Sequence, residues 1–387
     1  MRNKMRLGDI ATLITKGTTP TSVGYTFTDT GVNFVKIESI REDGTFIPDK
    51  FAHISDECNT KLKRSQLQEN DILFSIAGAI GRTAIVTKDC LPANTNQALA
   101  IIRIPQGVID YRFLLYALQS DAIIEQAEKQ KQGVAQLNLS LQNINDFEIP
   151  FFTEEEQLTV VEVLSSVDSL LSTRIAQLEQ LDELVKSRFI ELMASAELSE
   201  KMTVEQITER VKVGFVGTCE KYYTDDSGIP MLRTGNITDH GIDMSDIKYV
   251  TAEFHGKNKK SQIHSGDLLI ARHGSNGQAN VYDGPEAQCL NAVVIVPNQA
   301  VAKSVFLAGL INSPEVKQQI DRTLVGSTQH VVNTKSIANL MVRIASLEVQ
   351  EQYESFVEQT DKSKLAVQQS LEKLETLKKA LMQKYFG

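Results

Sequence analysis

The sequence has few cysteines and no long apolar run. Its 387 residues include Cys58, Cys90, Cys219 and Cys289, which are widely separated and form no Cys-x-x-Cys pair. This spacing argues against a zinc site or a disulfide framework and favours a reducing compartment. No stretch reaches the ~18 consecutive apolar residues of a membrane helix. The basic N-terminal residues are not followed by the apolar segment of a signal peptide. We therefore expect a cytoplasmic protein without membrane partners.

The sequence also lacks the common catalytic motifs. None of its 22 glycines forms Gly-x-Gly, so the dinucleotide fingerprint and the glycine-rich S-adenosylmethionine loop are both missing. There is no Gly-x-x-x-x-Gly-Lys-Ser/Thr loop, and the absence of Pro-Pro excludes the Asn/Asp-Pro-Pro-Tyr motif of amino-methyltransferases. The six histidines have no metal-ligand spacing, and we expect His255 and His264 to be solvated. We predict no catalytic residue, metal or cofactor in this chain.

Negative charge is concentrated in one segment. The net charge is −9, which is unusual for a DNA-binding protein. Residues 151–200 contain 11 acidic and 3 basic residues, whereas residues 1–150 and 201–345 are each within one charge of neutrality. The acidic segment is a poor DNA surface and a plausible surface for protein docking. The neutral segments remain compatible with a basic face for DNA.

The chain contains a long internal repeat, with an offset that drifts from 197 to 193 residues. The matched features are an apolar string after a glycine, an Asp followed by apolar residues, a Gly-x-x-Gly, a Gly-x-x-Gln, a single Gln and a leucine-rich string. In order, they begin at Gly31 and Gly228, Asp71 and Asp267, Gly78 and Gly274, Gly133 and Gly326, Gln157 and Gln350, and Leu178 and Leu371. Six matches in one order indicate a duplication, and the drift indicates small length changes in loops.

Each copy begins with a mixed α+β region. Short apolar runs bounded by Gly, Pro, Asn and Asp predict strands at 32–37, 72–76, 83–86 and 98–104 in the first copy, and at 231–235, 267–270 and 292–296 in the second. Helices are predicted at 111–131 and 304–322. These patterns predict globular domains over residues 1–152 and 199–345.

Each copy ends in a long helix. Thr153 and Glu156 fit a capping box, and no Pro or Gly follows before Gly214. Apolar residues then recur every seven residues, which is typical of a coiled-coil seam. The predicted seam residues are Leu164, Leu171, Leu178, Leu181 and Val185 in the first helix, and Leu371, Leu374, Leu377 and Leu381 in the second. We place the helices at 153–198 and 346–387.

The simplest partner for each long helix is the other. Antiparallel pairing would place the two globular domains at opposite ends of a coiled coil of about 60 Å, related by a pseudo-twofold axis. Such a protein suits a DNA target made of two separated half-sites. The seam leucines are expected to pack in this core and to form part of the partner-docking region.

Several polar residues of the first copy are candidates for DNA contact. Arginine and lysine pair with phosphates, and Asn and Gln pair with adenine edges. The candidates are Lys16, Thr18 and Thr19 in Lys16-Gly17-Thr18-Thr19-Pro20, then Lys36, Arg82 after the Gly-x-x-Gly, Asn94, Asn96, Gln97 and Gln136. Each segment has a structural alternative, namely an ordinary turn, a hairpin with solvated charges, or an amide that caps a loop.

Equivalent segments of the second copy supply further candidates. Glycines in such loops let the backbone approach a ligand closely. The candidates are Arg233, Arg272, His273, Asn276, Gln329 and His330. The same alternatives of turn formation and loop capping apply to them.

The sequence resembles the specificity subunits of type I restriction–modification systems. The resemblance covers nearly the whole chain and is carried by the two copies, the Asp71-Ile72-Leu73 strand before Gly78-x-x-Gly81, the Gly-x-x-Gln segment and the Glu-Gln opening of each leucine-rich helix. It implies two target-recognition domains that each read one half of a bipartite DNA site, with paired helices that set the spacer and dock two methyltransferase subunits.

The resemblance also implies the remaining partners. Restriction subunits would join through the methyltransferases, and S-adenosylmethionine, ATP and magnesium would bind to partner subunits. The two globular domains share only scattered positions, so we expect different half-sites and an asymmetric target. Two other hypotheses stay open: a stand-alone nuclease with a cryptic site, and a scaffold whose helices bind proteins.

Overall fold

The computed structural model describes residues 3–129, 138–238, 241–272, 277–325 and 331–387. The chain divides into two compact units. Unit 1 comprises Met1–Arg174 and Ser370–Gly387, and unit 2 comprises Ile175–Gln369. Each long helix therefore contributes residues to both units. The boundaries predicted for four separate domains stay a prediction.

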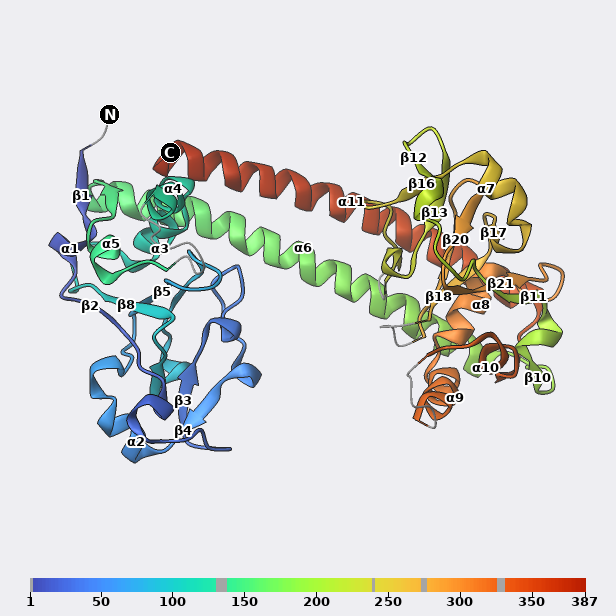
Figure 1. The fold of residues 1–387 in the computed structure, drawn as a ribbon, viewed down its shortest axis with the longest axis horizontal. Coiled ribbons are helices and arrows are strands. Elements are labelled where there is room, and N and C mark those ends of the chain that lie inside the picture. Colours follow the sequence, from blue (N-terminus) through green and yellow to red (C-terminus); the bar gives the residue numbers. More distant parts are fainter. Residues whose placement is uncertain (1–2, 130–137, 239–240, 273–276, 326–330) are drawn as a thin grey trace. The chain divides into compact units, whose positions relative to one another are not determined.

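Unit 1 is built on a four-stranded antiparallel sheet of order β2-β8-β5-β6 (Figure 1). A three-stranded sheet of order β4-β3-β7 and the pair β1-β9 accompany it. The strands are β1 (Lys4–Arg6), β2 (Leu13–Lys16), β3 (Val32–Val35), β4 (Ala52–Ile54), β5 (Ile72–Ser75), β6 (Thr83–Ile85), β7 (Ala93–Thr95), β8 (Leu99–Arg103) and β9 (Glu148–Pro150). The short helices are α1 (Leu7–Ile10), α2 (Asp56–Lys61), α3 (Tyr111–Gln119), α4 (Asp121–Lys129) and α5 (Leu141–Asn145).

Both faces of the four-stranded sheet are buried. Side chains of a strand alternate between its two faces. Ile72 and Phe74 of β5 pack with α3, α4 and the long helices, whereas Leu73 packs toward Val35 of β3. Unit 1 is thus a three-layer structure of helices, main sheet and small sheet.

Unit 2 repeats this plan. Its main sheet has the order β11-β21-β18-β19, and the small sheet is extended to β12-β16-β13-β20-β17. The main-sheet strands are β11 (Thr208–Val213), β18 (Leu268–Ala271), β19 (Ala279–Val281) and β21 (Ala292–Pro297). The other strands are β10 (Met202–Thr203), β12 (Tyr223–Thr224), β13 (Ile229–Leu232), β14 (Ile237–Thr238), β15 (Gly241–Ile242), β16 (Lys248–Val250), β17 (Gln262–Ile263), β20 (Ala287–Cys289) and β22 (Met341–Val342). The short helices are α7 (Ala252–Lys257), α8 (Ser304–Ile311), α9 (Pro314–Val325) and α10 (Thr334–Ala338).

The two predicted single helices of the globular regions are wrong, because each is broken in the structure. The first divides at Ser120, which adopts an extended backbone and whose hydroxyl donates to the carbonyl oxygen of Ala117. The second divides before Pro314, whose ring cannot continue a helix interior. The breaks let each pair of helices fold over the main sheet.

The two long helices are α6 (Glu154–Ser195) and α11 (Leu347–Phe386). The predicted capping box starts α6: the Thr153 amide donates to the Glu156 carboxylate at 2.9 Å. Within each unit the helices run antiparallel. In unit 1, Phe152 contacts Phe386 and Asp168 pairs with Lys378; in unit 2, Asp182 pairs with Lys364 and Phe189 contacts Tyr353. The predicted α+β fold with an antiparallel helix pair is confirmed.

Candidate nucleic-acid interface

Two candidate segments of unit 1 lie side by side. A Cβ at Gly17 would overlap the carbonyl oxygen of Thr95, and the Thr18 amide donates to that oxygen at 3.2 Å. The Thr19 hydroxyl also bonds the side-chain oxygen of Gln97. The end of β2 therefore meets the turn between β7 and β8, and brings exposed Lys16 and Gln97 onto one surface. Only glycine at position 17 permits this approach.

Two other candidate cations of unit 1 contact the protein itself. Lys36 Nζ lies 4.3 Å from the ring centroid of Phe27. Arg82 donates to the carbonyl oxygens of Ile37 and Ile40, at 3.4 and 3.0 Å. Arg82 thus holds the turn after β3, a structural role that differs from the solvated charge of the hairpin alternative.

The amide cluster contains one buried, one partly buried and one exposed side chain. Asn94 is fully buried and donates to Asn59 Oδ1 at 2.9 Å and to the Leu62 carbonyl at 3.2 Å. Asn96 accepts from the Ala98 amide at 3.0 Å, which shapes the turn. Of the three, only Gln97 is exposed. The geometry of Asn94 and Asn96 favours their structural alternative.

The two described candidates of unit 2 also make internal contacts. Arg233 forms an ion pair with Asp246 at 2.7 Å. Arg272 donates to Asn291 Oδ1 at 3.0 Å and to the Val332 carbonyl at 3.4 Å. Asn291 has a positive φ of 55°, so Arg272 steadies a left-handed turn. The candidates Gln136, His273, Asn276, Gln329 and His330 lie outside the described residues.

The second glycine of each Gly-x-x-Gly segment is packed against a helix. Gly81 has a φ of 90°, and a Cβ there would overlap Ile124 of α4. Gly277 has a φ of 69°, and its Cβ would lie 3.0 Å from Ile320 of α9. These glycines therefore allow a tight turn to approach a helix, as the hairpin alternative requires.

The repeated aspartates are buried in different electrostatic surroundings. Asp71 forms two 2.7 Å contacts with Arg103 of β8. Asp267 has no such pair among the described residues; burial raises its pKa above the usual 3.8, although the His264 backbone amide and Lys212 oppose that shift. Burial in turn lowers the pKa of Lys212. Lys212 and Arg103 come from different strands, yet both donate to equivalent carbonyls, those of Gln262 and Gln66.

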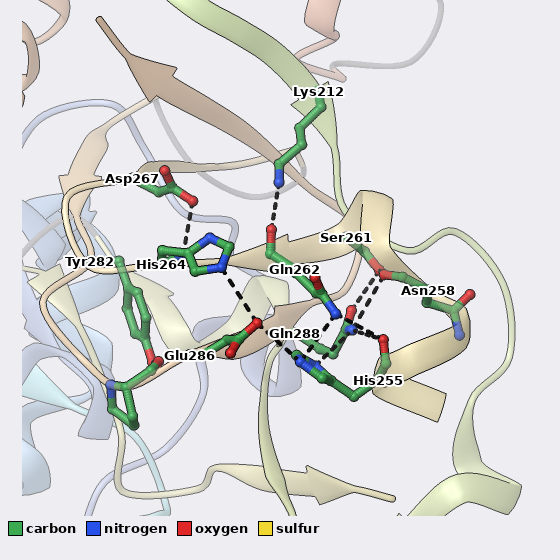
Figure 2. A network of polar contacts seen from close by, with 11 residues as sticks. Lys212, His255, Asn258, Ser261, Gln262, His264, Asp267, Tyr282, Glu286 and Gln288 are labelled. Carbon is green, nitrogen blue, oxygen red and sulfur yellow. Dashed lines mark hydrogen bonds and ion pairs between the residues drawn. The ribbon is translucent and has the colours of Figure 1, made fainter. Parts of the chain in front are cut away.

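A polar network in unit 2 surrounds His255 and His264 (Figure 2). The Gln288 amide nitrogen lies 3.1 Å from His255 Nδ1, and both histidines contact Glu286, at 3.2 and 3.4 Å. His255 is only 14% exposed. The expectation that His255 is solvated was therefore wrong, because a glutamine far along the chain reaches it.

A basic segment that was not among the candidates adjoins this network in unit 2, and an equivalent segment lies in unit 1. We call residues 61–65 and 257–261 the first and second basic turns. The first carries Lys61, Lys63 and Arg64, and the second carries Lys257, Lys259 and Lys260, all exposed. Their shared offset of 196, equal to that of the repeated Asp, is the sequence signal that identifies them.

The second basic turn forms one wall of a pocket of about 640 Å³. The opposite wall is 213–216, which begins at the last residue of β11 and includes Phe215 and Val216. Val216 is 62% exposed. In unit 1, β2 likewise packs beside η4 (Lys63–Ser65), so Lys16 and the first basic turn occupy corresponding places. Positive charge and loop side chains thus meet at the same place in each unit.

The predicted seam residues differ in burial. Leu164 is fully buried, and Leu171, Leu178, Leu181, Val185, Leu371, Leu374 and Leu381 are partly buried. Leu377 is 46% exposed and lies outside the packed seam, as does Leu184, its equivalent in α6. The described residues form no cluster of His, Cys, Asp and Glu suited to a metal, and none of their helices is long and apolar enough to cross a membrane.

A duplicated α+β unit joined to paired antiparallel helices defines a class of two-module recognition proteins. The chain belongs to the family described as the type I restriction modification DNA specificity domain, whose model matches residues 2–180 and again residues 201–377. The two matches confirm the duplication.

Individual relatives agree with the family. The EcoBI specificity subunit of Escherichia coli is 21% identical over 76% of this chain and 69% of its own length. The MjaVIII specificity subunit of Methanocaldococcus jannaschii is 23% identical over 98% of this chain and 90% of its own. A chain from a type I restriction–modification complex has a TM-score of 0.60 at 17% identity, covering 99% of this chain and 97% of that one. The S subunit from M. genitalium has a TM-score of 0.56 at 16% identity, covering 100% and 96%. These structures show the fold.

Proposed function

We propose that this chain is the DNA-specificity subunit of a type I restriction–modification complex, and that each unit reads one half of a bipartite site. The observation that carries the proposal is the duplicated recognition unit, with loops and a basic turn in corresponding places and with the family's DNA specificity domain matched twice. Two readers in one chain suit a target with two separated parts.

The two half-sites are expected to differ. Lys16-Gly17-Thr18-Thr19 of unit 1 corresponds to Val213-Gly214-Phe215-Val216 of unit 2. One segment offers a cation and two hydroxyls, whereas the other offers only apolar side chains. Since base edges are distinguished by their donors, acceptors and methyl groups, such loops favour different bases. The full target would therefore be asymmetric.

The long helices supply the docking surfaces for two methyltransferase subunits, and restriction subunits join through them. Exposed Leu184 and Leu377 are repeat-equivalent apolar side chains available for such contacts. In this proposal the chain performs no catalytic step. S-adenosylmethionine binds the methyltransferases, ATP and magnesium bind the restriction subunits, and the assembly works in the cytoplasm.

Methylation mapping tests the function. The chain is purified with its methyltransferase partner, and adenine methylation of a DNA library is mapped by single-molecule sequencing. We expect one bipartite asymmetric motif. Replacing residues 1–150 by the corresponding domain of another family member should change one half-site and leave the other unchanged. Methylation that is unaffected by this exchange would exclude the proposal.

A further inference from the structure

We propose that the two basic turns are backbone clamps, which bind DNA phosphates independently of base sequence and thereby position the reading loops. The inference rests on the proposed function, because it takes duplex DNA as the partner. It adds the residues that supply the charge-dependent part of binding. None of these residues was a candidate from the sequence.

The turns keep their charges while their neighbours change. The first reads Lys61-Leu62-Lys63-Arg64-Ser65 and the second reads Lys257-Asn258-Lys259-Lys260-Ser261. All three cationic positions and the serine are retained between copies. By contrast, the adjoining loops differ at nearly every position, as Lys16 and Val213 illustrate. A function common to both units, such as phosphate binding, accounts for retained charge beside divergent loops.

Five of the six cations are unengaged within the described part of the chain. They are exposed and make no side-chain hydrogen bond or ion pair with a described residue; they are Lys61, Lys63, Arg64, Lys259 and Lys260. Lys257 differs, because it pairs with Glu253 at 2.5 Å. Arg82, Arg233 and Arg272 are held by internal partners, so the basic turns present the more accessible charge.

Buried amides fix the backbone of both turns. Asn94 donates to the Leu62 carbonyl at 3.2 Å, and the equivalent Gln288 reaches the Asn258 carbonyl at 3.4 Å. Figure 2 shows Gln288 lying between the His255 and Ser261 side chains, below the second turn. Each turn's serine also donates to that same carbonyl, at 3.2 Å from Ser65 and 3.0 Å from Ser261. The cations are thus carried on a preorganised backbone, which lowers the ordering cost of binding.

The pocket relates the clamp to reading. In unit 2, the second basic turn faces Phe215 and Val216 across the pocket. A strand whose phosphates contact Lys259 and Lys260 would bring its adjacent groups toward this apolar wall. The clamp therefore fixes the position of the DNA strand along the protein. The opposite wall of the pocket contributes the base contacts, which differ between units. The two near-neutral globular segments, residues 1–150 and 201–345, can bind DNA because their unpaired positive charge is local rather than general.

Salt-dependent binding of the full chain, in complex with its methyltransferase partner, tests the clamp. Binding to a 40-base-pair duplex of random sequence is measured by fluorescence anisotropy across a range of salt concentrations. Each phosphate contact contributes about 0.9 to the slope of log K against log salt. We expect Lys259→Gln/Lys260→Gln to reduce the slope by about 1.8. Extrapolated from 1 M salt, this corresponds to roughly 60-fold weaker binding at 0.1 M. Lys63→Gln/Arg64→Gln should behave alike.

Two controls isolate the position of the charges. Lys259→Arg/Lys260→Arg keeps the charge and should retain the slope. Lys4→Gln/Lys201→Gln removes two exposed lysines outside the turns, at equivalent positions in β1 and on the approach to β10, and should leave the slope nearly unchanged. The clamp variants should still methylate the wild-type motif, at lower occupancy. A changed motif would contradict a sequence-independent role.

The outcomes separate the two proposals. If the wild-type complex binds no duplex at any salt, both the DNA function and the clamp are overturned. If the wild type binds but the clamp variants keep its slope, only the clamp is overturned. Normal DNA binding with loss of the methyltransferase on co-purification would instead assign the turns to an acidic protein partner, and would also overturn the clamp.

Discussion

In unit 1 the long helices pack against Tyr116 of α3, whereas the equivalent position on α8 of unit 2 is Gly309. A Cβ at Gly309 would lie 2.9 Å from both Phe189 and the Tyr353 hydroxyl. At this position unit 2 therefore takes its aromatic bulk from the long helices, and unit 1 takes it from Tyr116 of the globular domain. The unit 1 equivalents of Phe189 and Tyr353 are the smaller Met382 and Val160.

The buried polar groups show the same exchange. Asp71 is neutralised by Arg103 of β8, whereas the cation near Asp267 is Lys212 of β11. Asn94 reaches Asn59, whereas the longer Gln288 reaches His255 at the corresponding place. Both units thus retain similar core volume, a buried carboxylate near a cation, and a buried amide with hydrogen-bond partners. The sequence position that supplies each feature differs between the units. The two units therefore share one fold but pack its interior with different side chains.

Lengthening both helices should produce the largest effect. The ion pairs Asp168–Lys378 and Asp182–Lys364 lie two heptads apart in both helices, so the seam has one register in both units. Inserting seven residues after Arg174 and seven after Gln369 preserves both ion pairs and adds about 10 Å. If the helices set the spacer, it should grow by about three base pairs while both half-sites are kept. Mapped methylation checks this, and altered half-sites with an unchanged spacer would contradict it.

Removing the repeated carboxylates should affect the units unequally. Asp71→Asn leaves Arg103 without its partner and should cost about 3 kcal/mol. Asp267→Asn should cost about 1 kcal/mol or less, because Asp267 has no paired arginine and the amide still accepts from the His264 backbone. Hydrogen exchange read by mass spectrometry reports the two units separately. Equal losses would show that the local pairing does not set the cost.

Adding one carbon at the Gly309 position tests the packing exchange. Gly309→Ala should destabilise unit 2 by about 2 kcal/mol, because Phe189 and Tyr353 must shift. Combining it with Tyr353→Val, the residue type of unit 1, should cost less than the sum of the single changes. The measurement is a double-mutant cycle on denaturant unfolding. Strict additivity would mean that the two positions do not compete for space.

The smallest expected effect is on pH dependence. Because the pKa of Asp267 is raised in the folded chain, the folded state keeps this proton at pH values where the unfolded chain has lost it. The free energy of unfolding of unit 2 should therefore fall as pH rises above about 4. Asp267→Asn should remove this decline in stability. Hydrogen-exchange protection measured between pH 4 and 7 checks it, and an identical slope in both proteins would contradict it.

Periodic features were predictable from the sequence. The heptads gave both long helices to within a few residues, and the repeat gave two equivalent domains. The predictions that failed concern residues whose bonding partners are distant in the sequence. Asn94 and Arg82 resemble DNA-contacting residues, but they bond groups 35 and 45 residues away, which no local pattern reveals. The basic turns were missed for the opposite reason, since three exposed cations in one segment look like ordinary surface.

The sharing of each long helix between units has a consequence for synthesis of the chain. Phe386 of α11 packs on Phe113 and near Phe152 in unit 1. More than 230 residues separate Phe152 from Phe386, and at 5–20 residues per second their translation takes roughly 10 to 50 s. During that interval the nascent first unit exposes an aromatic surface on the ribosome. Premature termination would leave this surface uncovered, marking the incomplete product for chaperones and proteases before it reaches DNA.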